Sequence, residues 1–301
     1  MSGQGVNIIT ISQALRDGAR ALELAGIENP RIEARMLIAF AISTKAKKAG
    51  PETVLAESSR EMTSREIEIF NSSLRRRCNH EPMAYILGSR EFWSLPFRVT
   101  PATLIPRPDS ETLIEGVLKH IDNKSEEIRI LDLGTGSGCL LLALLSEFGN
   151  ARGIGVDVSN DALEVAKLNA NDLGLSARAE FINGDWNNLE FTKLLGGKFD
   201  LVISNPPYIS NAELKQLDIT VSAHEPIIAL DGGIDGLDSY RAIVGILHHL
   251  VNNDAMVAFE VGFSQGTAVA SLLSQSSMEV IEIMEDLSGI GRAVLARKIK
   301  P

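Results

Sequence analysis

The sequence predicts an α/β protein with a small helical bundle, a short extended hairpin and a doubly wound parallel sheet, in that order. In roughly the first 80 residues, apolar side chains recur every three to four positions, a spacing typical of amphipathic helices. From Ile128 onward, short apolar runs alternate with helical patterns, and the first of these runs leads straight into a glycine-rich loop. Alternation of this kind is typical of βαβ units around a parallel sheet.

Length and composition limit what the chain can be. Its 301 residues, 45% of them hydrophobic, are enough for about two globular domains. A net charge of −10 argues against a protein that binds long nucleic acids through their phosphates. The two cysteines, Cys78 and Cys139, are far apart and lack zinc-site spacing. With no apolar run of membrane-spanning length and no signal-peptide pattern, we expect a cytoplasmic protein.

The amino-terminal third contains three amphipathic patterns. The first predicts a helix over residues 10–25, Pro30 can open the second, and Ser64 is a candidate N-cap for the third. Three arginines, Arg75–Arg77, close that third helix, where cations complement the helix dipole. We interpret them as a solvated helix end rather than a docking patch.

Prolines and aromatics change the character of the chain over residues 81–108, and they exclude a long helix there. Within this stretch Glu91–Val99 predicts an extended hairpin. The predicted domains are therefore a helical domain over 1–84, a hairpin linker over 85–108 and an α/β domain over 109–301.

Two residues lie where the linker ends. Asp109 is a candidate cap for a helix that follows from Ser110. Arg107 stands between two prolines and is either a structural tether or part of a pocket wall. We favour the pocket wall.

The glycine loop follows a predicted strand over Ile128–Leu133 and precedes a predicted helix over Cys139–Phe148. Glycines there allow a ligand to approach the backbone without interference from a Cβ. The loop has G-x-G-x-G spacing rather than the G-x-G-x-x-G of dinucleotide-binding proteins, which argues against a dehydrogenase. Its members are Gly134, Thr135, Gly136, Ser137 and Gly138.

Acidic residues end the next two predicted strands. Asp157 follows the second strand, where a carboxylate can bind the hydroxyls of a ribose. Its alternative role, capping the next helix, can be filled by Ser159. The third strand ends near Asp185 and Trp186, an acid and an aromatic that suit an adenine amino group and ring. The alternative there is a surface turn beside a core tryptophan.

The fourth predicted strand, Phe199–Ile203, delivers Asn205-Pro206-Pro207-Tyr208 to its carboxyl end. Two prolines stiffen this turn and remove two backbone donors, so that it presents oxygen acceptors. The Asn205 Oδ1 and the Pro206 carbonyl suit the two hydrogens of a planar N–H2 group, and the Tyr208 ring suits its flat face. The alternative is a proline turn that only ends a strand.

Taken together, these motifs resemble those of S-adenosylmethionine-dependent methyltransferases and, more narrowly, of the release factor glutamine-N5 methyltransferases, the HemK or PrmC family. The narrower resemblance extends from about residue 80 to the end of the chain. Besides Asn205–Tyr208, it is carried by Glu81–Gly88, Arg90–Trp93, Thr103–Glu111, Glu225–Pro226, Ala229–Leu230, Gly232–Gly233, Asp235–Leu237, Glu260–Gly262 with Gln265, and Asp286–Gly289 with Arg292.

The resemblance implies a seven-stranded Rossmann-like class I methyltransferase domain whose last strand is antiparallel. It implies S-adenosylmethionine as methyl donor, S-adenosylhomocysteine as product, and the glutamine of a Gly-Gly-Gln loop in peptide chain release factors as substrate. The implied cofactor contacts are Gly134 to Gly138, Asp157, Trp186 and Asn205, and the position of Asp185 after the third strand adds that residue to them. The implied catalytic residues are Asn205, Pro206 and Tyr208, and the implied substrate contacts are Asn205 to Tyr208 with Arg107.

Two other functions fit parts of the pattern. An adenine or cytosine amino-methyltransferase acting on nucleic acid would use the same turn on a flipped base, and a cofactor-binding regulator would need no turnover. The acidic charge opposes the first and the intact acceptors oppose the second. We expect no metal, since the histidines lack ligand spacing, and we expect a monomer. Glu260, at the end of a predicted strand, either faces the cofactor or anchors a loop.

Overall fold

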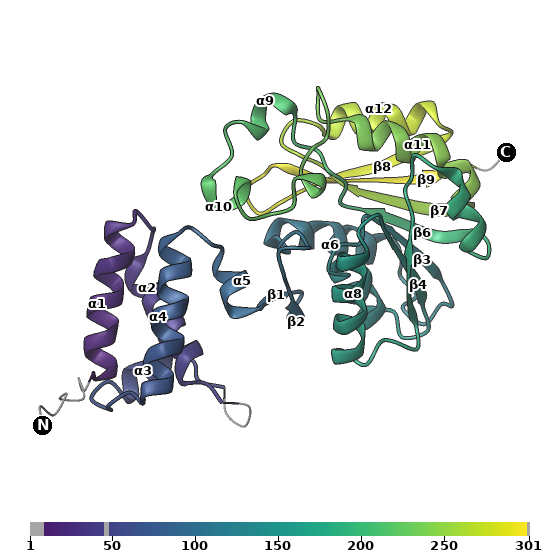
Figure 1. The fold of residues 1–301 in the computed structure, drawn as a ribbon. Coiled ribbons are helices and arrows are strands. Elements are labelled where there is room, and N and C mark those ends of the chain that lie inside the picture. The colour runs from purple at the N-terminus through teal and green to yellow at the C-terminus, as the bar shows by residue number, and fades with distance from the viewer. Residues whose placement is uncertain (1–8, 45–47, 300–301) are drawn as a thin grey trace, which may run out of the picture. The chain divides into compact units, whose positions relative to one another are not determined.

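The computed structural model describes residues 9–44 and 48–299, which form two compact units. The first unit holds the described residues up to Gly88 together with Ile219–His224, and the second holds Ser89–Asp218 and the chain from Glu225 onward. Figure 1 shows the first as a group of helices and the second as a sheet with helices on both faces.

Five helices of the first unit enclose a small apolar core. Three of their amphipathic faces, on α1, α2 and α4, were predicted from the sequence. The helices are α1 (Ile11–Leu24), α2 (Pro30–Ile42), α3 (Pro51–Ala56), α4 (Ser64–Cys78) and α5 (Met83–Leu87). The short helix α10 (Ile219–Ser222) comes from much later in the chain and groups with them.

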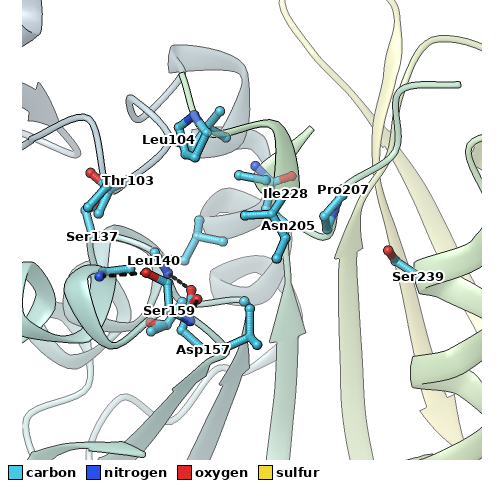
Figure 2. A pocket seen from close by; sticks show the side chains of 18 of the residues that line it. Thr103, Leu104, Ser137, Leu140, Asp157, Ser159, Asn205, Pro207, Ile228 and Ser239 are labelled. Carbon is cyan, nitrogen blue, oxygen red and sulfur yellow. Dashed lines mark hydrogen bonds between the residues drawn. The ribbon is translucent and has the colours of Figure 1, made fainter. Parts of the chain in front are cut away.

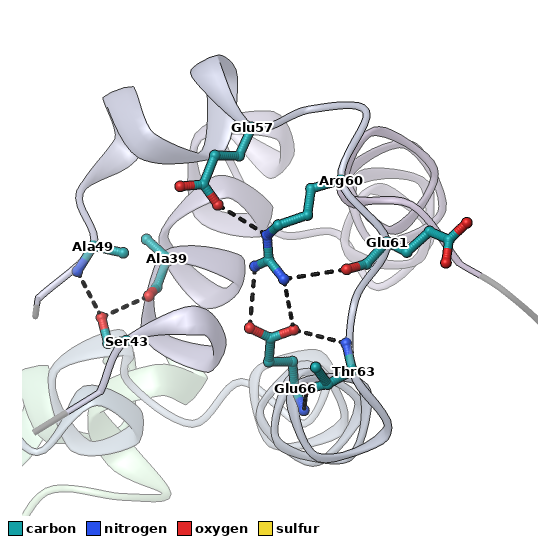
Figure 3. A network of polar contacts seen from close by, with 8 residues as sticks. All are labelled: Ala39, Ser43, Ala49, Glu57, Arg60, Glu61, Thr63 and Glu66. Carbon is teal, nitrogen blue, oxygen red and sulfur yellow. Dashed lines mark hydrogen bonds and ion pairs between the residues drawn. The ribbon is translucent and has the colours of Figure 1, made fainter.

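Polar contacts fix the ends of helix α4. Its N-cap is Thr63 rather than Ser64, and Thr63 forms a reciprocal capping box with Glu66. Figure 3 shows Arg60 binding the Glu66 carboxylate through both terminal guanidinium nitrogens and Glu57 through its Nε. At the other end, the expectation of a solvated arginine cluster is wrong for Arg77, which is buried and paired with Glu33.

The second unit contains a seven-stranded sheet in the order β5-β4-β3-β6-β7-β9-β8. Within the described residues, β9 alone runs antiparallel to the other six strands. This confirms the predicted Rossmann-like sheet with an antiparallel last strand. The strands are β3 (Arg129–Leu133), β4 (Arg152–Asp157), β5 (Ala179–Asn183), β6 (Phe199–Ser204), β7 (Val251–Glu260), β8 (Met278–Glu285) and β9 (Gly291–Lys298).

Each face of the sheet has its own core, because successive side chains of a strand point to opposite faces. On β6, Val202 joins the core beneath α11 and α12, whereas Leu201 and Ile203 join the core beneath α6, α7 and α8. The two sets of helices therefore cover opposite faces (Figure 1). Their bounds are α6 (Glu111–His120), α7 (Cys139–Glu147), α8 (Asn160–Asp172), α11 (Asp238–Leu250) and α12 (Gly266–Gln275).

The predicted hairpin is present as β1 (Ser89–Phe92) and β2 (Leu95–Arg98). It packs within the second unit, where Phe92 and Phe97 are buried in the core beneath α6 and α7. Trp93 donates from its indole nitrogen to Glu147. The aromatic residues of this stretch therefore fasten the hairpin to the sheet domain.

The remaining elements of the second unit are short. A 3-10 turn, η1 (Pro108–Ser110), precedes α6, so Ser110 rather than Asp109 is the N-cap of that helix. The others are η2 (Leu189–Leu194), α9 (Asn211–Leu214) and η3 (Ile227–Ala229). Among the helices that the structure describes, none has the length and apolar character needed to span a membrane.

Candidate active site

A cavity of about 280 Å³ opens at the carboxyl edge of the sheet. The sheet order reverses between β3 and β6, and this reversal is where open α/β sheets bind ligands. Leu133 and Ser204 are paired across those two strands, so the glycine loop and the Asn205 turn begin side by side. Figure 2 shows Asp157, Ser159, Asn205 and Pro207 among the side chains around this cavity.

Most of the residues singled out from the sequence border this cavity, although they come from distant parts of the chain. Those that line it are Arg107, Gly134, Thr135, Gly136, Ser137, Asp157, Asp185, Trp186, Asn205 and Pro207. Three others, Gly138, Pro206 and Tyr208, are not among its lining residues. Figure 2 also shows Leu104 and Ile228 at the cavity, two apolar side chains that the sequence had not singled out.

Two glycines of the loop have different surroundings. A Cβ on Gly136 would meet nothing within 4 Å, so this backbone is open to a ligand. Gly138 adopts φ +80°, and a Cβ there would lie 3.2 Å from Leu142 and 3.3 Å from Ala166. Gly138 is thus needed for close packing between loop and helices, whereas Gly136 belongs to the cavity surface.

Asp157 joins two of the loops that border the cavity. Its Oδ2 accepts a hydrogen bond from the Gly136 amide at 2.9 Å, and its Oδ1 accepts one from the Ser159 amide at 2.9 Å. Burial raises the pKa of its carboxyl, against these backbone hydrogen bonds. Ser159, and not Asp157, caps α8 by accepting from Ala162 N. The capping alternative for Asp157 is therefore filled by its neighbour, as the sequence suggested.

Asp185 and Trp186 follow β5 but differ in exposure. Asp185 is exposed and accepts hydrogen bonds from the backbone and side-chain nitrogens of Asn187, each at 2.9 Å. The Trp186 ring is half-buried and stands against Gly134, where an added Cβ would lie 3.4 Å from it. This tryptophan therefore forms a flat apolar wall beside the glycine loop.

Asp132, a residue that the sequence analysis missed, supports the glycine loop from within β3. It is fully buried, and its Oδ2 accepts a hydrogen bond of 2.7 Å from the Thr135 hydroxyl. Its Oδ1 has no hydrogen-bond partner among the described residues. Burial raises the pKa of Asp132 to about 7, with the nearby Asp157 acting in the same direction. The sequence does contain a signal for this role of Asp132, because an acidic residue inside an apolar strand, just before the glycines, is unusual.

In the turn that follows β6, the Asn205 side chain faces the cavity and the Tyr208 side chain faces Glu260. The Asn205 Nδ2 donates to the Ser110 hydroxyl at 3.4 Å, and the side chain lines the cavity. Tyr208 turns away and directs its hydroxyl at Glu260 Oε1, 3.5 Å distant. Burial raises the pKa of the Tyr208 phenol, reinforced by the Glu260 charge. Gln265 Nε2 donates to the Tyr208 carbonyl at 2.9 Å and holds this turn in place.

Arg107 serves as both tether and wall. Its guanidinium lies 2.5 Å from Glu225 Oε1, and Glu225 Oε2 accepts from the Ile105 amide at 3.1 Å. The Glu225 side chain is 1% exposed, whereas that of Arg107 is 36% exposed and borders the cavity. Glu225 therefore ties one cavity loop, Thr103–Arg107, to another that begins at Pro226.

The cavity combines an open stretch of loop backbone, a carboxylate and a flat aromatic wall. Gly136 exposes backbone, Asp157 supplies a carboxylate, and Trp186 supplies a flat face. Within residues 9–44 and 48–299 no three His, Cys, Asp or Glu side chains come together as a metal site. A seven-stranded Rossmann-like sheet with this site defines a methyltransferase of the S-adenosylmethionine-dependent class.

Comparisons with known proteins narrow the class to a family. A methyltransferase domain model matches residues 124–256, and a PrmC N-terminal domain model matches residues 13–88. The release factor glutamine methyltransferase of Bradyrhizobium diazoefficiens is 39% identical over 97% of this chain and 96% of its own. That of Rhodospirillum rubrum is 40% identical over 96% and 86%. The chain belongs to the release factor glutamine methyltransferase family.

A solved structure shares the fold at lower identity. The catalytic domain of hMettl16, solved in complex with the MAT2A 3′UTR hairpin 6, has a TM-score of 0.57 and 17% identity, and the match covers 74% of this chain and 84% of that one. This likeness agrees with the seven-stranded sheet described above.

Proposed function

We propose that this protein transfers a methyl group to the side-chain amide nitrogen of the glutamine in the Gly-Gly-Gln loop of peptide chain release factors. The observation that carries the proposal is the position of Asn205. Its side chain borders the same cavity as the glycine loop and Asp157, and its Nδ2 is directed to Ser110, which leaves the carbonyl oxygen for a ligand.

The cavity would hold S-adenosylmethionine, which supplies an electrophilic sulfonium methyl group when bound. Gly136 would offer its exposed backbone to the methionine portion, and Asp157 would accept from the ribose hydroxyls. Trp186 would pack against the flat base, with Asp185 near the base's amino group. A hydrogen bond to a charged carboxylate contributes about 1.5–3 kcal/mol, so Asp157 would account for a large share of cofactor affinity.

The substrate amide needs acceptors because its nitrogen lone pair is shared with the carbonyl. Asn205 Oδ1 and the Pro206 carbonyl would each bind one amide hydrogen, which orients the nitrogen and increases its electron density. The N–H group becomes acidic only as the new bond forms, so no separate base is needed before attack. Pro207 and Arg107 line the cavity and would contact the substrate loop. Tyr208, whose hydroxyl is directed at Glu260 and not into the cavity, would support the turn.

The two units suggest a division of labour that follows the predicted domains. The helical part, residues 1–84, would bind the body of the release factor, residues 85–108 would connect the domains, and residues 109–301 would carry out methyl transfer. Binding energy from such a remote contact positions the reacting group. We place this activity in the cytoplasm and assign it to a monomer.

A competition assay tests the proposal. The protein is incubated with methyl-labelled S-adenosylmethionine and an equimolar mixture of a purified release factor and adenine- and cytosine-containing single-stranded DNA. We expect label only in the release factor, and none when its Gly-Gly-Gln glutamine is replaced by glutamate. Label in the DNA instead, with binding that weakens steeply as salt is added, would contradict the proposal and favour a nucleic-acid methyltransferase.

A further inference from the structure

A buried polar chain connects the Asn205 amide to a carboxylate behind it. Asn205 Nδ2 donates to Ser110 Oγ, and Ser110 is 3% exposed. Glu260 at the end of β7 is 2% exposed, and the nearby Ser110 hydroxyl lowers the pKa of its carboxyl, although no hydrogen bond of regular geometry joins the two side chains. One of its oxygens, Oε1, lies 3.5 Å from the Tyr208 hydroxyl. Tyr208, at one end of the turn, therefore contacts the buried Glu260 carboxyl directly, and Asn205, at the other end, contacts Ser110, which lies near that carboxyl.

Glu260 is held firmly while part of its carboxyl stays unsatisfied. Its backbone carbonyl accepts a 2.7 Å hydrogen bond from the Tyr240 hydroxyl. Its Oε2 is buried and has no partner of regular hydrogen-bond geometry among the described residues. A buried carboxylate oxygen without a hydrogen-bond donor is unfavourable in free energy, because its charge is not solvated. A nearby hydroxyl group that can rotate is therefore expected to turn its hydrogen toward such an oxygen.

The direction of donation through this chain follows from the chemistry of its members. An ionised carboxylate can only accept, and the unsatisfied Glu260 Oε2 therefore favours rotation of the Ser110 hydroxyl so that its proton points toward that oxygen. The Ser110 oxygen is then left as an acceptor, which suits the N–H2 end of Asn205 and not its carbonyl end. The chain therefore selects one of the two flipped orientations of the Asn205 amide.

We propose that Ser110 and Glu260 are positioning residues that fix the Asn205 amide with its Oδ1 turned toward the cavity. This inference rests on the proposed function, in which that oxygen accepts a hydrogen of the substrate amide. Neither residue touches the reacting atoms. Their effect is to keep the acceptor oriented before substrate arrives, so that no reorganisation is needed during the reaction.

The Glu260→Gln variant should reverse the direction of donation. The glutamine side chain gains an N–H2 group, so it can donate to Ser110, which the carboxylate cannot do. Ser110 would then accept from that nitrogen, and its own proton would face Asn205 and favour the carbonyl end. We expect kcat to fall about 10- to 100-fold, since removing one preorganised partner outright costs about 10²- to 10³-fold. Cofactor Kd should stay unchanged.

Ser110 offers a matched pair of variants. Ser110→Ala removes the link and should lower kcat by a similar factor with little change in KM. Ser110→Thr keeps the hydroxyl and should restore most of the rate. A purely structural role would show instead as parallel losses of melting temperature in the alanine and threonine variants. Glu279→Gln and Ser274→Ala, at exposed positions far from the cavity in sequence, are controls expected to match the wild type.

The pH profile gives a second readout. Burial raises the pKa of Glu260 to about 7, while Ser110, Arg292 and Tyr208 oppose the shift and Asp109 adds to it. Tyr240 and Cys139 are the other titratable groups that interact with its charge. Protonated Glu260 can donate to Ser110, so wild-type kcat should decline as pH falls through this region. In the Glu260→Gln variant, kcat should not decline over this pH range.

A measurement that needs no catalysis completes the test. In protein labelled with ¹⁵N-asparagine, the side-chain signal of Asn205 is assigned by its loss in Asn205→Ala. We expect this signal to shift in Ser110→Ala and in Glu260→Gln and to stay in place in Ser110→Thr. An identical signal in all of these variants would overturn the inference, even if the wild type failed to methylate a release factor. Failure of wild-type methylation alone would overturn only the proposed function.

Discussion

Removing the Glu225 carboxylate should loosen the cavity wall by an amount that the structure allows us to work out. Glu225 accepts from Arg107 and from the backbone amide of Ile105. In Glu225→Ala the Ile105 amide loses its acceptor, which costs about 1–3 kcal/mol for a buried donor. Arg107 is partly exposed and regains water, so losing the ion pair adds only about 0–1 kcal/mol. The expected loss of unfolding free energy is therefore about 1–4 kcal/mol.

The Glu225→Gln variant separates the two contributions. Glutamine keeps an oxygen for the Ile105 amide but removes the charge, so it should lose only about 1 kcal/mol. Urea denaturation gives the free energies, and hydrogen exchange at the Ile105 amide reports the local contact. We expect faster exchange in Glu225→Ala than in Glu225→Gln. Equal destabilisation by both variants, with Ile105 exchange unchanged, would refute this account of the wall.

Three further outcomes are expected. Asn205→Ala should lose about 2.7–4 kcal/mol of transition-state stabilisation, measured as kcat on a release factor, while its cofactor Kd by calorimetry stays near the wild-type value. Asp157→Asn should weaken cofactor binding by roughly 10- to 100-fold in the same calorimetry, because a charged hydrogen bond of about 1.5–3 kcal/mol is lost. Burial raises the pKa of both Asp132 and Glu260 to about 7, so the folded state binds more protons than the unfolded state between about pH 4 and 7. Unfolding free energy should therefore fall as pH rises through that window, and urea titrations should show a shallower fall in Glu260→Gln; an unchanged slope would contradict the shift.

The order of the main elements was predictable because the strands β3 to β6 and the helices α1, α2 and α4 are marked locally. Apolar runs ending in glycine, Asp157 or Asn205 fixed where the strands of the sheet finish, and carboxyl ends of parallel strands meet at one edge. Helical periodicity did the same for the amino-terminal helices. These signals lie within about 15 residues of chain, which is why sequence alone reveals them.

Contacts between distant segments were not predictable. Glu225 binds Ile105 across 120 positions, and nothing local to either residue indicates the other. The direction of the Tyr208 ring, toward Glu260 and away from the cavity, depends on how β6 and β7 pair. The grouping of Ile219–His224 with the amino-terminal helices likewise arises from tertiary packing. The N-cap of α6 is Ser110, one residue after the expected Asp109, because a 3-10 turn precedes the helix.

The central claim is that an amide nitrogen held by the Asn205 turn receives the methyl group. The most direct test is tandem mass spectrometry of a release factor after incubation with this protein and isotopically labelled S-adenosylmethionine. The account predicts one added methyl group, carried by the side-chain nitrogen of the Gly-Gly-Gln glutamine, and its absence when Asn205→Ala replaces the wild type. A methyl group on any other residue, or equal modification by Asn205→Ala, would contradict it.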